Sequence, residues 1–180
     1  MRHVDVGQSV DVETACVLSG REERALVQKI LLGARGVSFL LQISLNIPGF
    51  PKDMPENGDV LSSAARVFEK KIREHPSVHV FISNGAGRAE ILSFGGDALS
   101  AKASCMEIEE GHEWGRAIDA DIITQNGPLS RSSLGIEPRR CLLCGEPAKI
   151  CARRRAHATR ELRAEISRLL RLVPPESLCP

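Results

Sequence analysis

The amino-acid sequence predicts an α+β protein, built as a single domain over residues 1–180 with a mixed sheet and flanking helices. A length of 180 residues fits one domain. Segments of helical and of strand-like periodicity alternate irregularly, which favours α+β over an orderly doubly wound sheet. The last part of the chain combines an apolar stripe with arginines on the opposite face, as expected for a basic C-terminal helix. This Cys/Arg-rich segment and its helix span about residues 138–172.

The first predicted helix begins near Ser19. Ser19 and Glu22 have the spacing of a capping box, in which a hydroxyl caps the first turn and a carboxylate returns to the cap. Leu26 and Ile30 then form one apolar stripe, and Gly33 is a suitable stop. We therefore expect a helix with a buried face that ends at this glycine.

The remaining elements follow from apolar periodicity and from the turn residues between segments. A period of two predicts strands, and a period of 3.6 predicts helices. In chain order we expect a strand over 37–45, a helix over 61–74, strands over 78–82 and 89–94 joined as a hairpin at Asn84-Gly-Ala-Gly87, a helix over 98–110, a strand over 118–124 and a helix over 156–172.

The composition indicates a soluble chain with a sizeable core. Hydrophobic residues make up 42% and charged residues 26%, and no apolar run approaches the roughly 18 residues that a bilayer crossing needs. The first residues contain no apolar stretch of the kind found in secretion signals. We therefore expect a cytoplasmic protein with no membrane partner, whose six cysteines are reduced thiols or metal ligands.

Charge is distributed unevenly along the chain. The net charge is +1, yet residues 131–180 hold 11 Lys and Arg against 5 Asp and Glu, whereas residues 1–130 hold 13 against 18. Such a basic segment either binds phosphates or forms a solvated helical tail. The near-neutral total argues against a general nucleic-acid coat, and five Phe, one Trp and no Tyr argue against stacking on single strands. We expect no nucleic-acid partner.

Two carboxylates, Asp119 and Asp121, form the first candidate site. Residues two apart in a strand point to the same face, so two like charges would lie side by side and repel each other. A divalent cation removes this repulsion, and carboxylate oxygens suit Mg²⁺, which also binds substrate phosphates. The alternative is an edge strand that exposes both aspartates to water. Ile118, Ile122 and Ile123 favour a buried strand, where an unpaired carboxylate pair would be costly. On these residues alone, the Mg²⁺ site and the exposed pair both remain open.

Cys141, Cys144, Cys151 and His157 form the second candidate site. Their spacing, Cys-X2-Cys-X6-Cys-X5-His, could complete a tetrahedral structural zinc site. The first gap is normal for zinc, whereas the two later gaps are less standard. The alternative is a set of partly buried thiols that pack as small apolar groups. The loose spacing favours packed thiols over zinc.

Arginines flank these cysteines on both sides. Arg139 and Arg140 precede the first cysteine, and Arg153 follows the third. Guanidinium groups are planar, permanently charged forks that match phosphate oxygens. The triplet that starts at Arg153 could equally face water, so phosphate binding and solvation both remain open for it.

Taken together, these segments resemble the apo-citrate lyase phosphoribosyl-dephospho-CoA transferases, also called the holo-acyl-carrier-protein synthases of citrate lyase. The similarity extends over nearly the whole chain. No single piece is specific, but their order and spacing are. The segments that carry the resemblance are Arg21-Glu-Glu-Arg24 with Gln28, Asn46-Ile-Pro-Gly49 with Lys52, Gly115-Arg116 with Asp119-X-Asp121, Ser130-Arg131, Arg139-Arg-Cys-Leu-Leu-Cys144, Cys151-Ala-Arg153 and His157.

The resemblance implies a transferase domain with a nucleotidyltransferase-type reaction. The donor would be 2′-(5″-triphosphoribosyl)-3′-dephospho-CoA, and the acceptor a serine hydroxyl of the acyl carrier (gamma) subunit of citrate lyase. Pyrophosphate would leave, and the prosthetic group would remain on a phosphodiester. The fold could then be nucleotidyltransferase-like, although the Gly-Ser motif usual about ten residues before the carboxylates is absent from residues 107–111.

The resemblance also implies roles for individual residues. The catalytic residues would be Asp119 and Asp121, which hold Mg²⁺, and Arg116, which clamps a phosphate oxygen or braces the carboxylates. The donor would be held by arginines of the basic segment, namely Arg131, Arg139, Arg140 and Arg153.

Two departures from the family pattern lie next to the carboxylates. Ala120 stands where the family often has a larger aliphatic residue, and Trp114 precedes Gly115 rather than lying beside the first aspartate. Both indicate local repacking around a retained carboxylate pair. Two functions of another class remain as alternatives: a zinc-stabilised binding module, and a non-catalytic assembly factor that docks an acidic carrier protein on the basic segment.

Overall fold

The computed structural model of the chain describes residues 11–54 and 60–174. Its helices and strands confirm the α+β class, and the strand predicted over 118–124 has the expected bounds. In chain order the elements are α1 (Val12–Leu32), β1 (Phe39–Leu45), α2 (Val60–Ile72), β2 (Val78–Asn84), β3 (Gly87–Phe94), α3 (Ala98–Gly111), the 3-10 helix η2 (Glu113–Ala117), β4 (Ile118–Thr124), β5 (Gly127–Pro128), the 3-10 helix η3 (Ser132–Leu134), α4 (Ala148–Arg154) and α5 (Thr159–Leu170).

The strands form one sheet in the order β2-β3-β1-β4-β5. Every neighbouring pair in it is antiparallel, so the described sheet is not the mixed sheet that the sequence predicts. The reason is that each crossover helix skips a strand. α2 connects β1 to β2 across β3, and α3 connects β3 to β4 across β1. Strands of the same direction are therefore never adjacent, as in the split βαβ arrangement.

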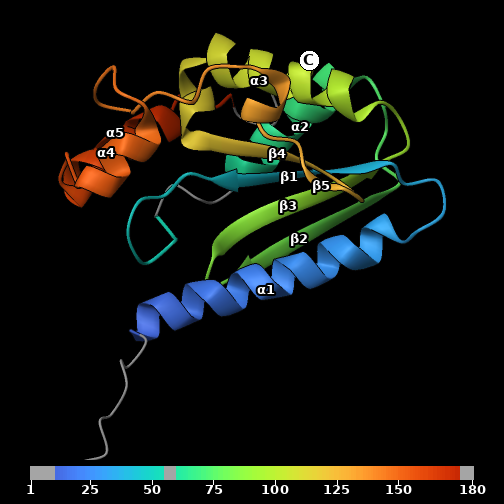
Figure 1. Cartoon of the computed structure of the whole chain (residues 1–180), viewed down its shortest axis with the longest axis horizontal. Helices are drawn as coiled ribbons and strands as arrows, with labels where there is room; N and C mark the ends of the chain where they lie inside the picture. Colours follow the sequence, from blue (N-terminus) through green and yellow to red (C-terminus); the bar gives the residue numbers. More distant parts are fainter. Residues whose placement is uncertain (1–10, 55–59, 175–180) are drawn as a thin grey trace, which may run out of the picture.

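The two faces of the sheet differ in polarity. Its apolar face packs against α2, α3 and α5 and forms the main core, and α1 lies along the opposite face (Figure 1). Near α1 there is a smaller apolar cluster centred on Val37, Leu40 and Ile91. Because Ile118, Ala120 and Ile122 point into the main core, the residues between them in β4 point toward the α1 side.

The first helix differs from its prediction in its start and in its buried face. α1 begins at Val12, so Ser19 lies inside the helix and forms no capping box. Leu26 and Ile30 are 60% and 65% exposed rather than buried. Arg24, by contrast, is only 7% exposed. The sheet face beneath α1 is partly polar, and the helix therefore turns its polar stripe toward it.

The glycine at position 20 lets α1 approach the β2–β3 hairpin closely. The side-chain amide of Asn84 donates a hydrogen bond to the Gly20 carbonyl at 2.9 Å. A Cβ atom at Gly20 would lie 2.5 Å from the backbone nitrogen of Ala86. This contact fixes the height of α1 above the sheet.

The basic C-terminal helix predicted over 156–172 is α5, and the structure adds a second short helix, α4, before it. Arg155, which has a left-handed backbone with φ of 49°, ends α4. α5 carries the apolar stripe that includes Ile166 and Leu169, both fully buried. α4 has no such stripe in the sequence, which explains why apolar periodicity does not predict it.

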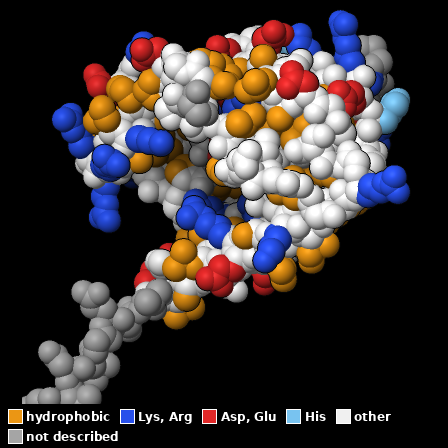
Figure 2. All heavy atoms as spheres, turned by 45° about the vertical axis from the view of Figure 1, so that its right-hand side comes forward, with side chains coloured by type: hydrophobic (Ala, Val, Ile, Leu, Met, Phe, Trp, Pro, Cys, Tyr) orange, Lys and Arg blue, Asp and Glu red, His pale blue; other side chains and the backbone are white. Residues whose placement is uncertain are grey.

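The surface is hollowed between the lobe of α4 and α5 and the helix α1. Figure 2 shows Lys and Arg side chains on this lobe and on the floor of the hollow. Among the described residues, the helices are too short or too polar to span a membrane.

Candidate functional site

Two adjoining cavities occupy this hollow. The smaller one, which we call the polar cleft, has a volume of about 360 Å³ and lies between α1, the sheet and the loop after β1. The larger one, the arginine pocket, measures about 820 Å³ and lies between this loop, the start of β4 and the α4–α5 segment. Asn46 lines both cavities. The polar cleft is lined by Val17, Arg21, Arg24, Gln28, Gln42, Ser44, Leu45, Asn46, Ile47, Lys52, Ala86, Asp119 and Asp121.

The two predicted carboxylates lie side by side in the polar cleft. Asp119 and Asp121 share the face of β4 that points toward α1, opposite Ser44 and Gln42 of β1. The Asp119 side chain is 51% exposed. Burial, and then the neighbouring Asp119, raise the pKa of the Asp121 carboxyl to about 6. The same-face prediction is confirmed, and the repulsion expected between the two carboxylates is present.

The backbone between the two aspartates is held from the core side by α3. The Lys102 ammonium donates to the Ala120 carbonyl at 3.0 Å, and the Ala120 N–H donates to Glu109 Oε1 at 3.1 Å. Both side chains are buried. β5 pairs only with Ile123 and Thr124 at the end of β4. The backbone groups of Ala120 on the side away from β1 therefore have no strand partner among the described residues. Two buried charges replace the missing ladder and fix the carboxylate-bearing strand.

Three cations line the polar cleft, and the sequence prediction had assigned them no role. Arg24 donates from Nη2 to the Gly87 carbonyl at 2.8 Å, while its buried Nε has no hydrogen-bond partner among the described residues. Burial and the nearby Arg21 lower the pKa of Arg24, and burial, Arg21 and Arg163 lower that of Lys52. A buried donor without an acceptor, crowded by like charges, indicates an anion-binding site.

The signal for two of these residues is present in the sequence. Arg21, Arg24 and Gln28 follow the spacing i, i+3, i+7, which places them on one face of a helix. A polar stripe of this kind is usually solvated, and only the position of α1 over the sheet turns it into the wall of a cleft.

The third cation is positioned by a loop that α5 holds in place. Arg163 donates to the carbonyls of Pro48, Pro51 and Asp53 at 3.2, 2.9 and 2.8 Å. Within the loop, Lys52 Nζ donates to the Ile47 carbonyl at 2.7 Å. The loop is thus tied to the C-terminal helix, and its lysine is directed to the cleft.

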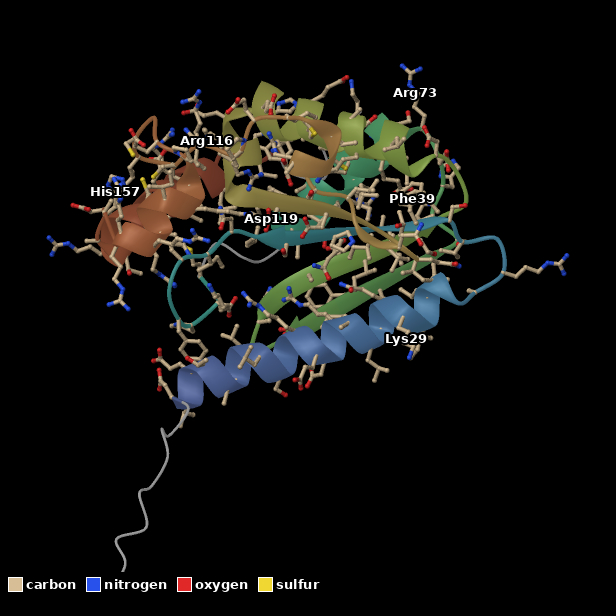
Figure 3. All side chains as sticks on the ribbon, viewed as in Figure 1. Lys29, Phe39, Arg73, Arg116, Asp119 and His157 are labelled. Atoms are coloured by element: carbon tan, nitrogen blue, oxygen red, sulfur yellow. The ribbon has the colours of Figure 1, made fainter. Side chains whose placement is uncertain are left out.

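Arg139, not Arg116, contacts the carboxylate pair. Arg139 Nη1 lies 3.3 Å from Asp119 Oδ1, and Nη2 donates to the Ile118 carbonyl at 2.7 Å. Arg116 donates to the Cys141 carbonyl and lines the arginine pocket. Figure 3 shows Arg116 above the sheet and Asp119 nearer to α1. The arginine that holds Asp119 in place is therefore Arg139, which lies twenty positions later in the sequence.

The other arginines of the prediction lie outside the polar cleft. Arg131 pairs with Glu109 at 2.7 Å and with Glu110 at 2.5 Å. Arg140 donates to the Gly145 carbonyl at 2.7 Å and lines the arginine pocket. Arg153 is exposed on α4 and lines neither cavity.

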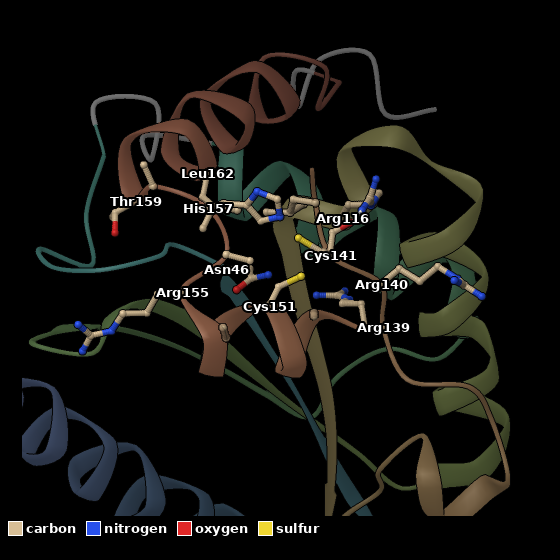
Figure 4. A pocket seen from close by; sticks show the side chains of 15 residues that line it. Asn46, Arg116, Arg139, Arg140, Cys141, Cys151, Arg155, His157, Thr159 and Leu162 are labelled. Carbon is tan, nitrogen blue, oxygen red and sulfur yellow. Dashed lines mark hydrogen bonds between the residues drawn. The ribbon is translucent and has the colours of Figure 1, made fainter. Parts of the chain in front are cut away.

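The arginine pocket combines guanidinium groups with an apolar wall. In Figure 4, Cys141, Cys151 and His157 lie together, whereas Arg155 extends away from them. The lining residues are Asn46, Arg116, Arg139, Arg140, Cys141, Leu142, Ala148, Cys151, Ala152, Arg155, Ala156, His157, Ala158, Thr159 and Leu162.

The predicted cysteine and histidine residues converge into one cluster that could hold a metal ion such as zinc. The ligand atoms of Cys141, Cys144, Cys151 and His157 all lie within 4.8 Å of one another. Cys144 Sγ is 3.4 Å from Cys151 Sγ and 3.3 Å from His157 Nε2. Zinc ligated at about 2.3 Å separates two sulfurs by roughly 3.8 Å, so small shifts would seat an ion.

The thiols of this cluster are not equivalent. Burial acts to raise the pKa of Cys141, but hydrogen bonds from the Leu143 and Cys144 backbone, and from the Cys144 and Cys151 thiols, outweigh it and lower the pKa. The pKa of Cys151 is raised to about 12, mainly by its hydrogen bond with Cys144. Backbone N–H groups directed at Cys141 favour the thiolate, which is the form that ligates metals.

Comparison with known proteins identifies the relatives of this chain. A model of the apo-citrate lyase phosphoribosyl-dephospho-CoA transferases matches residues 12–172. A probable apo-citrate lyase phosphoribosyl-dephospho-CoA transferase of Streptococcus pyogenes serotype M18 is 30% identical over 166 residues, 88% of this chain and 85% of that protein. The apo-citrate lyase phosphoribosyl-dephospho-CoA transferase of Escherichia coli O9:H4 is 30% identical over 158 residues, 86% of each chain. The chain therefore belongs to the apo-citrate lyase phosphoribosyl-dephospho-CoA transferase family.

Proposed function

We propose that this chain transfers the phosphoribosyl-dephospho-CoA group from 2′-(5″-triphosphoribosyl)-3′-dephospho-CoA to a serine of the citrate lyase acyl carrier subunit. Family membership supports the reaction. The observation that carries it is the polar cleft, which is lined both by Asp119 and Asp121 and by Arg24, whose buried Nε has no hydrogen-bond partner among the described residues. Cations for a polyphosphate and carboxylates for a divalent ion are what a phosphoryl-type transfer needs in one place.

The reaction forms one bond and breaks one bond at phosphorus. The serine oxygen bonds to the phosphorus that carries the ribosyl group, and the bond from this phosphorus to the next bridging oxygen breaks. Pyrophosphate leaves with that oxygen, and the proton of the serine hydroxyl passes to the solvent. The product is a phosphodiester between the serine and the prosthetic group.

Asp119 and Asp121 fit a divalent cation such as Mg²⁺. Their oxygens are the hard ligands this ion prefers. Burial, and then repulsion by Asp119, raise the pKa of Asp121, and a bound cation would remove that repulsion. When bound, Mg²⁺ would neutralise phosphate charge. Two protein carboxylates leave room for phosphate oxygens and water, as usual for this ion.

The side chains of the chain itself hold and orient the donor. Arg21, Arg24 and Lys52 would bind the two phosphates that leave as pyrophosphate. Arg139 would keep Asp119 in place through their 3.3 Å contact. The predicted clamp role of Arg116 would then be exerted from the arginine pocket.

The cysteine and histidine cluster would hold a structural zinc ion. Four protein ligands leave no open position for a substrate, so such an ion would fix the segment before α5 rather than take part in transfer. The convergence of all four ligand atoms supports zinc over packed thiols, which the spacing alone favours. The cluster also favours the rival function, a zinc-stabilised binding module.

Pyrophosphate release separates the transferase from both rivals. The wild-type chain should release pyrophosphate only when donor, Mg²⁺ and acyl carrier subunit are all present, in an amount equal to the carrier consumed. A binding module or an assembly factor releases none. A folded chain that binds the carrier and releases no pyrophosphate would rule out the proposed function.

A further inference from the structure

The donor carries two anionic groups, and the described hollow offers two cationic cavities. This inference rests on the proposed function, which supplies the donor. One group is the triphosphate on the added ribose; the other is the 5′-diphosphate that joins adenosine to the pantetheine arm. The adenosine and the added ribose separate the two groups. The polar cleft and the arginine pocket are likewise separate and meet at Asn46.

The polar cleft suits the triphosphate and not the pantetheine arm. It contains the carboxylates at which transfer would occur, and its volume of about 360 Å³ is the smaller of the two. Most of its lining side chains are polar or charged, including Arg21, Arg24 and Lys52. An uncharged chain of methylene and amide groups would leave these cations without partners.

The arginine pocket has the size and the mixed lining that an amphipathic chain requires. Its volume is about 820 Å³, within the range of cavities that enclose drug-sized ligands. Leu142, Ala152 and Leu162 provide an apolar wall for methylene groups. Arg116 and Arg155 provide guanidinium groups for phosphate oxygens.

Arg155 has two properties of a residue kept for a ligand. Its side chain makes no hydrogen bond or ion pair with any described residue, although it lines the pocket. Its backbone is left-handed, with φ of 49°, at a helix end where glycine is the usual residue. Such a conformation costs free energy in arginine, which the surrounding structure must offset.

We propose that the arginine pocket binds the dephospho-CoA half of the donor, with the 5′-diphosphate at Arg155 and the pantetheine arm along the apolar wall. The triphosphate then lies in the polar cleft, and the ribose units pass Asn46. The donor bridges both cavities and presents its reacting phosphorus to Asp119 and Asp121.

Two halves of the donor, used as separate probes, test this arrangement by calorimetry on the full chain with Mg²⁺ present. Dephospho-CoA probes the arginine pocket, and inorganic triphosphate probes the polar cleft. Arg155→Gly removes the side chain and suits the left-handed backbone, so the protein should stay folded. It should weaken dephospho-CoA binding about tenfold, as expected for the loss of a charge-assisted contact, and leave triphosphate binding unchanged. Lys52→Met should weaken triphosphate binding and leave dephospho-CoA binding unchanged.

Two further variants keep the test decisive. Ala152→Glu places a carboxylate on the pocket wall at a helical position that tolerates it, and should also weaken dephospho-CoA binding alone. Arg154→Ala, on the same helix but outside both cavities, should change neither affinity. The inference is overturned if wild type fails to bind dephospho-CoA, or if Arg155→Gly and Ala152→Glu bind it as wild type does. Because no carrier is present, such a result leaves pyrophosphate release, and thus the proposed function, intact.

Discussion

At the scale of single residues, the site depends on charges of opposite sign that share one cleft without neutralising each other. Asp119 and Asp121 lie on β4, and Arg21, Arg24 and Lys52 lie on α1 and on the loop after β1. The buried Arg24 Nε has no acceptor among the described residues. A buried donor without an acceptor is costly unless a ligand completes it. A phosphate chain with a divalent cation would satisfy both sets.

The carboxylate pair should be essential for transfer. Asp119→Asn and Asp121→Asn keep the side-chain shape but remove the charge that binds a cation. Each should lower kcat/KM at least about a hundredfold, the scale of removing a main electrostatic contributor. Circular dichroism should show an unchanged fold. Near-normal turnover in either variant would refute the carboxylate assignment.

Arg24 should act on the donor. Arg24→Lys retains the charge but cannot both donate to the Gly87 carbonyl and reach the cleft. We expect KM for the donor to rise about tenfold with kcat less affected. Lys29→Met, exposed on the same helix, is the control and should behave as wild type. Equal KM values for wild type and the Arg24 variant would show that this side chain is only structural.

At the scale of elements, the cleft depends on how closely α1 lies over the sheet. Gly20 allows this approach, because a Cβ there would meet the Ala86 nitrogen at 2.5 Å. The loop after β1 is tied to α5 by Arg163. The α4–α5 segment is tied together at the cluster of Cys141, Cys144, Cys151 and His157. Each wall of the hollow is therefore fixed by identifiable contacts.

Gly20→Ala tests the close approach of α1 to the hairpin, because the expected change in stability has the opposite sign to that of an exposed helical glycine. In a freely exposed helix, glycine to alanine stabilises by about 1 kcal/mol. Here the clash should destabilise the protein by about 1–3 kcal/mol and reduce donor affinity. Ser19→Ala, one residue earlier and exposed within the helix, should be neutral or slightly stabilising. A rise in Tm for Gly20→Ala in thermal unfolding would contradict the close approach.

The metal cluster can be tested by elemental analysis. Protein purified without added zinc should contain about one zinc per chain, and Cys144→Ser should lose it together with thermal stability. Cys16→Ser, an exposed cysteine outside the cluster, should change neither zinc content nor Tm. A zinc content far below one per chain would favour packed thiols instead.

At the scale of the whole molecule, local patterns predicted more than the arrangement in space. The strand with Asp119 and Asp121 and the hairpin turn at residues 84–87 both depend on spacing of a few residues, whereas the loose spacing of Cys141, Cys144, Cys151 and His157 did not favour their convergence. The antiparallel strand order depends on crossovers that skip a strand, and apolar periodicity contains no signal for them. A periodic segment does not specify which neighbours its strand will pair with.

The site was predicted incompletely for the same reason. The spacing of Arg21 and Arg24 defines a helix face but does not say what the face meets. Proximity in sequence suggested that Arg116 braces the carboxylates, whereas the chain returns to place Arg139 there. The short helix α4 was not predicted because its seven residues carry no apolar stripe, and the left-handed arginine that ends it has no sequence signal comparable to glycine.

The central claim is the transfer of the prosthetic group, and the intact mass of the acyl carrier subunit tests it most directly. The carrier should be incubated with this chain, the triphosphoribosyl-dephospho-CoA donor and Mg²⁺. We predict a mass increase of one phosphoribosyl-dephospho-CoA group, lost when the carrier serine is replaced by alanine or when the chain carries Asp121→Asn. An unchanged carrier mass with folded wild-type chain and intact donor would contradict the account.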